Sequence, residues 1–273
     1  MTVVTCKVPL VSRDPVTGQI DAILLIITAD CDINKSKFGT HLACLQVLSY
    51  QRYVSSVWAA RKLARALATQ VGQLQEQMNK WNKLRIGAPS SLSPDVVEEW
   101  VRRAEPHSIA KDLRVPESDA PKFTNSLQTF RDALQALEAN KSSGHLAQYA
   151  SFRSVITGVP AAECLQQAIQ KAIAEPLPED VFFLPALPQL DTRPALVLLR
   201  DLVAVPARNI CFRTLDATST DMFLRLGRLQ PTLKYAISQA FGTLYSRIGL
   251  PKPFEDRCKA ALEQTINLDW EQS

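Results

Sequence analysis

The residues of this sequence best suited to chemistry are cations placed beside short apolar segments. Arg225 and Arg228 flank a glycine where an apolar strand pattern passes into a helix pattern. Lys234 and Arg247 follow on that helix, on the side that we expect to be exposed. Because helix N-termini and clustered cations hold phosphate groups well, this strand–helix corner is a candidate phosphate site.

A second group of cations lies nearer the start of the chain and includes Arg61, Lys62 and Arg65. Between Ala43 and Ser90 there are seven basic residues and one acid, and between Arg193 and Lys259 there are eleven basic residues and five acids. The net charge of the whole chain is only +4. Two basic regions in a nearly neutral chain predict faces that meet phosphate, either of nucleic acid or of lipid head groups. The alternative for each region is an ordinary solvated helix face.

No residues form a pattern that predicts catalysis, a metal site or a cofactor. The phosphate-binding, nucleophile-elbow and zinc-protease motifs are absent, and the six cysteines include no C-x-x-C pair. His41 and Cys44 are spaced to pair on one helical turn, but no orienting acid is identifiable. Asp30 and Asp32 alternate as in a calcium loop, yet Lys35 occupies the glycine position. We therefore expect a protein that is not an enzyme, with no cofactor and no metal.

The longest helical pattern runs from His41 to Ile86 and carries apolar residues at alternating spacings of three and four. This spacing is typical of a helix seam that must be buried. Packing against the chain's own helices would make a bundle, whereas packing against a copy would make an oligomer. The candidate self-association residues of this seam are Leu67, Val71, Leu74, Met78 and Trp81.

The remaining chain divides into β-rich ends and a helical middle. Two strands around a turn are predicted within residues 1–30, and helices over Phe123–Ala139 and Ala147–Ile173. Ser93-Pro94-Asp95 is a strong helix start. Beyond Glu175, prolines and apolar runs predict strands again.

The fold class expected from this order is α+β, predominantly helical, with a central helical lobe flanked by N- and C-terminal β segments. The expected domains are residues 1–40, a β hairpin region that joins the C-terminal sheet; residues 41–174, the helical lobe; and residues 175–273, strands that end in amphipathic helices.

The segments MFLRL and KYAISQAFGTLYSRIGLP resemble the C-terminal strand and helix of bornavirus matrix proteins. The resemblance covers about thirty residues of the chain, and those family members are shorter, mostly β and without a helical lobe. It implies a virion matrix protein that self-assembles, lies on the inner face of a membrane and contacts RNA.

The expected function is therefore that of a non-enzymatic viral structural protein of matrix type. Its expected partners are copies of itself, RNA and an anionic membrane surface. The alternatives are an RNA-binding nucleocapsid or coat protein and a non-viral helical interaction module. With no signal peptide or transmembrane segment apparent, we expect it in the virion and in the host cytoplasm or nucleus.

Overall fold

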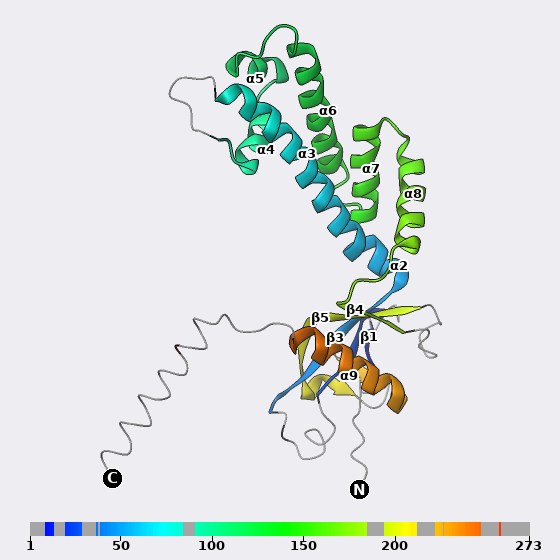
Figure 1. The fold of residues 1–273 in the computed structure, drawn as a ribbon. Coiled ribbons are helices and arrows are strands. Elements are labelled where there is room, and N and C mark those ends of the chain that lie inside the picture. The colour runs from blue at the N-terminus through cyan, green and yellow to red at the C-terminus, as the bar shows by residue number, and fades with distance from the viewer. Residues whose placement is uncertain are drawn as a thin grey trace, which may run out of the picture. The chain divides into compact units, whose positions relative to one another are not determined.

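The protein has a mixed α+β fold whose helices lie centrally in the sequence (Figure 1). The computed structural model describes residues 9–13, 20–28, 37, 39–83, 91–184, 194–211, 222–225, 227–246 and 257. The chain forms two compact units. The helical unit comprises residues 49–176, and the sheet unit combines residues 1–48 with 177–273.

The sheet unit contains a seven-stranded sheet in the order β4-β5-β3-β2-β1-β7-β6. The strands are β1 (Pro9–Arg13), β2 (Ile20–Ile26), β3 (His41–Ser49), β4 (Val181–Leu184), β5 (Ala195–Pro206), β6 (Ile210–Cys211) and β7 (Phe223–Arg225). A short 3₁₀ turn, η2 (Ala207–Asn209), separates β5 from β6. Strands from both ends of the chain thus share one sheet, as the returning β character predicted.

The first two strands form the predicted hairpin, with Pro9 opposite Leu25 and Val11 opposite Ile23. The prediction of helix from His41 onward was wrong, because His41–Ser49 is strand β3. Its register places Leu45 opposite Leu25 in an antiparallel pair. The apolar spacing of this segment fits a buried strand as well as a helix, and pairing along the sheet decides between them.

Strand β5 changes faces along its length. Leu199 shares a buried cluster with Leu45 of β3, whereas Val205 shares one with Cys44, the neighbour of Leu45. In a regular strand Leu199 and Val205 would point to the same face. The segment between them, Arg200–Ala204, is exposed.

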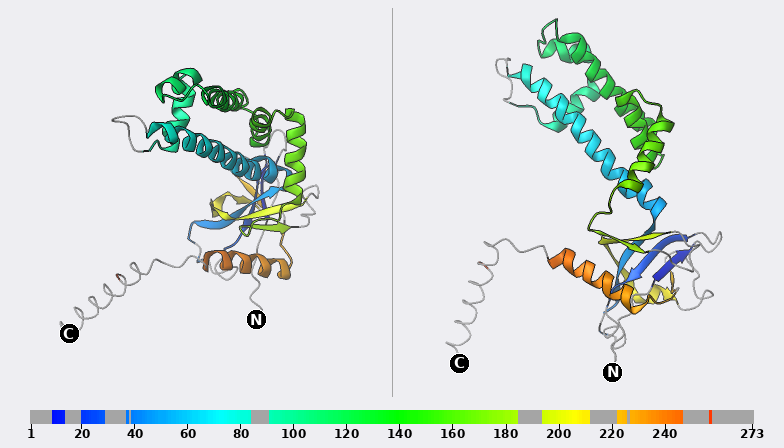
Figure 2. Two further views of the ribbon diagram at one scale, coloured as in Figure 1. Left: turned by 45° about the horizontal axis from the view of Figure 1, so that its top comes forward. Right: turned by 45° about the vertical axis from the view of Figure 1, so that its right-hand side comes forward.

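Helix α9 (Pro231–Ser246) packs across one face of this sheet (Figure 2). Ile237 is fully buried and Leu244 nearly so, in a cluster with Val197 and Leu199 of β5. The apolar side of this helix, formed by Leu233, Ile237, Phe241 and Leu244, is therefore the face that covers the sheet.

The helical unit is built from one long helix and shorter helices beside it (Figure 1). Its elements are α2 (Tyr50–Arg52), the π-helical turn η1 (Tyr53–Trp58), α3 (Ala59–Asn82), α4 (Pro94–Arg103), α5 (Pro106–Asp112), α6 (Ala120–Ala139), α7 (His145–Thr157) and α8 (Ala161–Ala174). Ser93 caps α4 as predicted, since its hydroxyl accepts the Val96 N–H.

The seam of α3 is buried inside the helical unit. Val71, Leu74, Met78 and Trp81 are at most 6% exposed and Leu67 is partly buried, all in one cluster with residues of α4, α5, α6 and α7. The ring of Trp81, for example, lies 4.9 Å from that of Phe123. These five residues are thus already covered by the chain's own helices, which corrects their assignment as self-association contacts. The apolar faces of the neighbouring helices of the same chain bury the seam.

The predicted helix over Ala147–Ile173 is two helices, α7 and α8. Gly158 ends α7 in the left-handed conformation, with φ of 72°, and Pro160 precedes α8. Glycine adopts that conformation without a steric penalty and proline cannot continue a helix, so the sequence turns back here. In the described part of the chain, no helix combines the length and the apolar character needed to cross a membrane.

Candidate polyanion-binding surface

Glu175, the residue that follows α8, ties the end of that helix to the start of α3. The indole Nε1–H of Trp58 donates to Glu175 Oε2 at 2.9 Å, and Lys62 Nζ donates to Oε1 at 2.7 Å. The Lys62 ammonium also lies 5.4 Å from the centre of the Trp58 ring. Because Trp58 and Lys62 are one helical turn apart, one carboxylate can hold both.

These contacts change the acidity of Glu175. The hydrogen bond from Lys62 holds the pKa of this carboxyl below its usual value, helped by the Trp58 hydrogen bond and by the charges of Lys62 and Lys171. Partial burial opposes the shift. Lys171 lies one helical turn before Glu175 in the sequence, so its positive charge acts in the same direction.

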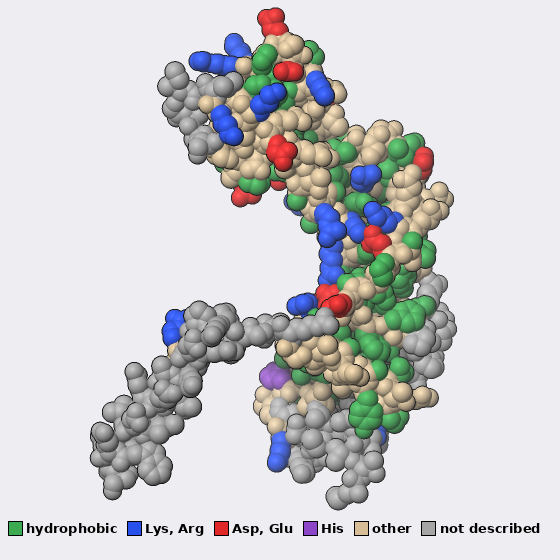
Figure 3. All heavy atoms as spheres, viewed as in Figure 1, with side chains coloured by type: hydrophobic (Ala, Val, Ile, Leu, Met, Phe, Trp, Pro, Cys, Tyr) green, Lys and Arg blue, Asp and Glu red, His purple; other side chains and the backbone are tan. Residues whose placement is uncertain are grey.

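We call five cations of the neighbouring helices the basic surface: Arg61, Lys62, Arg65, Arg153 and Lys171. The first three belong to α3, Arg153 to α7 and Lys171 to α8. Figure 3 shows Lys and Arg side chains gathered over the part of the helical unit where these three helices meet. The contact of Lys62 with Glu175 and the packing of α3 against α7 thus bring the helix that carries the predicted trio next to later helices of the chain.

A pocket of about 230 Å³ opens between α7 and α8 and is lined by Tyr149, Arg153, Gln167 and Lys171, among others. Tyr149 is half-buried and meets the Trp58 ring edge to face at 6.0 Å. A phosphate at this pocket would meet two cations, while the Tyr149 ring offers apolar surface beside them. Cations interleaved with an aromatic ring are typical of surfaces that bind single-stranded nucleic acid.

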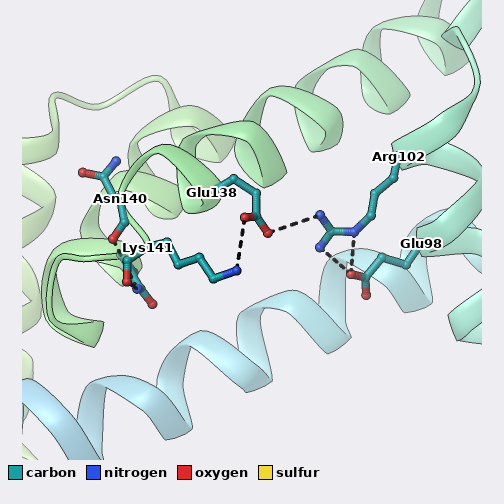
Figure 4. A network of polar contacts seen from close by, with 6 residues as sticks. Glu98, Arg102, Glu138, Asn140 and Lys141 are labelled. Carbon is teal, nitrogen blue, oxygen red and sulfur yellow. Dashed lines mark hydrogen bonds and ion pairs between the residues drawn. The ribbon is translucent and has the colours of Figure 1, made fainter.

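At the other end of the helical unit, several cations are paired with carboxylates. Arg102 pairs with Glu98 at 2.7 Å and reaches Glu138 at 3.9 Å, and Lys141 lies 3.8 Å from the same Glu138 (Figure 4). Arg103 and Arg131 also have carboxylate partners there. In contrast, Arg65, Arg153 and Lys171 form no ion pair with any residue that the structure describes.

The candidate phosphate residues of the sheet unit are less uniform than predicted. Arg228 is exposed just before α9, and Arg225 is half-buried in β7. Lys234 is only 2% exposed, which corrects its assignment to the exposed side of the helix. It lies three residues before Ile237 and therefore on the same, buried side of α9. Arg247 lies outside the described residues.

Sequence reasoning missed Arg153 and Lys171. Each lies one helical turn from a residue that contacts Trp58: Arg153 follows Tyr149, and Lys171 precedes Glu175. That spacing is a usable signal only once Gly158 is recognised as the end of a helix, because a single long helix would carry Arg153 and Lys171 far apart.

The possible nucleophile pair of His41 and Cys44 does not form. Both residues lie in strand β3, and His41 Nδ1 is 2.8 Å from the Thr40 hydroxyl. Burial raises the pKa of the Cys44 thiol to about 12, so the reactive thiolate is scarce at neutral pH. Cys44 acts as a small apolar core residue between sheet neighbours.

Within the described residues, no group of three or more His, Cys, Asp or Glu side chains is arranged to hold a metal ion. The segment around Asp30 and Asp32, whose resemblance to a calcium loop the sequence argued against, lies outside those residues. The chain matches no protein-family model, no curated protein and no solved structure. The resemblance to bornavirus matrix proteins accordingly remains an expectation from the sequence.

Proposed function

We propose that this chain is a non-enzymatic structural protein of matrix type that binds the phosphates of single-stranded RNA through the basic surface. The observation that carries the proposal is that Arg65, Arg153 and Lys171 have no carboxylate partner among the described residues, and that two of them, Arg153 and Lys171, line the Tyr149 pocket. A location in the virion and in the host cytoplasm or nucleus belongs to the same proposal.

The chemistry of this surface suits a phosphate backbone better than a single acidic group. Its cations come from three different helices, so they offer charge over a wide area rather than at one point. The nearby Glu175 is already neutralised by Lys62. Each phosphate that such cations neutralise releases counterions, which makes binding strongly dependent on salt.

The direct test is a triple substitution of Arg65, Arg153 and Lys171 by Gln in the full chain. Affinity for a fluorescent, unstructured RNA oligonucleotide would be measured by anisotropy at several salt concentrations. We expect weaker binding and a salt slope smaller by about 2, since each phosphate contact contributes roughly 0.7 on single strands. Circular dichroism would check that the helices remain.

A matched control removes three other exposed cations of the helical unit: Lys111, Arg114 and Lys122 to Gln. The net charge changes equally, but these residues lie on α5 and α6 or between them, away from the basic surface. Equal loss of RNA binding in both triple variants would show a diffuse charge effect and would refute the proposed surface.

A second candidate ligand, an anionic membrane, is favoured by the outer face of α8. Ile169 is 40% exposed and Ile173 is 67% exposed, one helical turn apart. Apolar residues exposed on a helix beside cations suit peripheral contact with lipid. Flotation with phosphatidylserine vesicles should then weaken when Ile169 and Ile173 are replaced by Gln, with RNA binding unchanged; retained flotation would reject this candidate.

A further inference from the structure

Lys234 lies on the buried face of α9, where a charged side chain is unexpected. It extends the stripe of Ile237, Phe241 and Leu244 by one turn toward the start of the helix. Only 2% of its surface is exposed. Its long stem therefore does not carry the ammonium into open solvent, as surface lysines usually do.

The ammonium of Lys234 has no partner among the described residues. No carboxylate lies within ion-pair distance, and no described residue hydrogen-bonds to the ammonium, whereas the backbone N–H donates to the Gln230 carbonyl at 3.1 Å. Burying a charge without a partner is costly. A cation in the first turn also opposes the helix dipole, so helix stability does not explain its position.

The same turn of α9 presents free donors. Pro231 has no N–H, and the N–H groups of Thr232 and Leu233 make no hydrogen bond to a described residue. Side chains on a helix lean toward its N-terminus, so the Lys234 ammonium is carried toward these groups. Arg228, exposed and without an ion pair among the described residues, precedes them by only a few residues.

We propose that the first turn of α9 is an anion-binding site, in which Lys234 supplies a buried charge and the Thr232 and Leu233 N–H groups donate to oxyanion oxygens. The ligand class is a phosphate monoester. A terminal phosphate carries up to two negative charges, against one on a phosphodiester, and so matches an ammonium and two N–H donors better. This site lies in the sheet unit and does not depend on the RNA-binding surface proposed for the helical unit.

The test uses the full chain in a phosphate-free buffer. Thermal unfolding and titration calorimetry would be recorded with inorganic phosphate, adenosine 5′-monophosphate and dihexanoyl phosphatidic acid. We expect a rise in Tm with at least one of them. The ligand that binds most tightly identifies the source of the phosphate as free ion, nucleotide or lipid. No binding by any of the three would overturn the proposal.

Two variants locate the site. Lys234→Met keeps the apolar stem and should weaken phosphate affinity by about tenfold or more, since a charge-assisted hydrogen bond is lost. Thr232→Pro removes one donor where proline is tolerated and should weaken affinity less. Arg208→Met, an exposed cation in the same unit, is the matched control and should bind as the wild type does.

The outcomes separate this proposal from the RNA proposal. Lys234→Met should leave RNA affinity unchanged, and the Arg65, Arg153 and Lys171 triple variant should keep the phosphate-induced rise in Tm. Without phosphate, Lys234→Met should unfold at the same temperature as the wild type or a higher one. A clear fall would reveal a protein partner for the ammonium and refute the site, as would equal phosphate binding by Lys234→Met.

Discussion

The helical unit and the sheet unit place their cations in opposite ways. In the helical unit, Arg102 and Lys62 are examples of cations that lie near the surface and pair with carboxylates, Glu98 and Glu175 respectively. In the sheet unit one cation, Lys234, is buried beneath a helix. The difference teaches that charge excess along a sequence locates a basic region but does not say whether its members reach solvent.

The largest expected effect comes from giving the helical unit a buried lysine of its own. Met78 is fully buried in the α3 seam, so Met78→Lys places an unpaired charge in a packed core. We expect a loss of about 4 kcal/mol in unfolding free energy, measured by urea denaturation. Gln77→Lys, on the exposed face of α3, is the control.

The same variant tests where self-association occurs. If the seam were an interface between copies, Met78→Lys would yield a folded monomer from a larger species in light scattering. Because the seam is internal, we expect unfolding instead, with any oligomer of the wild type held by another surface.

A smaller effect is expected from weakening the core of the sheet unit. Ile237 is fully buried between α9 and the sheet, so Ile237→Ala should cost about 3 kcal/mol through lost apolar contact and a cavity. RNA affinity should be unchanged, because the basic surface belongs to the other unit. A parallel fall in RNA affinity, at a temperature where the variant remains folded, would contradict that separation.

The contacts of Glu175 with Trp58 and Lys62 should contribute about 1 kcal/mol to the free energy of unfolding at neutral pH, and Glu175→Gln would remove this contribution. The pKa of Glu175 is lowered in the folded chain, so its contribution is present above the unfolded pKa and is lost as pH falls through the lower, folded value. The stability difference between wild type and Glu175→Gln should therefore shrink below about pH 4.3. Urea denaturation at pH 7 and at acid pH checks this; a constant difference would contradict it, and Glu76→Gln serves as the control.

The smallest expected effect is a gain in stability. Arg114 follows α5 in the left-handed conformation, with φ of 52°, where glycine is preferred. Arg114→Gly should raise the unfolding free energy by about 0.5–1 kcal/mol. Lys122→Gly, inside α6, should lower it by a similar amount. The two glycine variants, compared by thermal unfolding, show whether backbone strain at Arg114 is real.

Periodicity predicted much of this fold because most segments bury one clear face. The hairpin of β1 and β2, the Ser93 cap and the apolar seam of α3 all follow from local patterns. The prediction from periodicity was wrong for His41–Ser49, because a strand buried on both faces resembles a buried helix in sequence. The change of buried cluster along β5 was not predicted from the sequence either.

The candidate site was predicted only in part, for a related reason. Arg61, Lys62 and Arg65 are adjacent in sequence, so their charge excess is visible at once. Arg153 and Lys171 join them only through the reversal of the chain at Gly158. Lys234 was misplaced because its charge, rather than its position on the helix, was taken to decide its exposure.

The sheet draws its strands from both ends of the chain, and this has a consequence for synthesis on the ribosome. β1, β2 and β3 emerge early, but β5, the neighbour of β3, follows about 150 residues later, which at ribosomal rates is roughly 10–30 seconds. During that delay the helical unit is complete in the nascent chain, while the edge of β3 that will pair with β5 is still unpaired. Holding chaperones, and the speed of translation through residues 49–194, should therefore govern the yield of native protein.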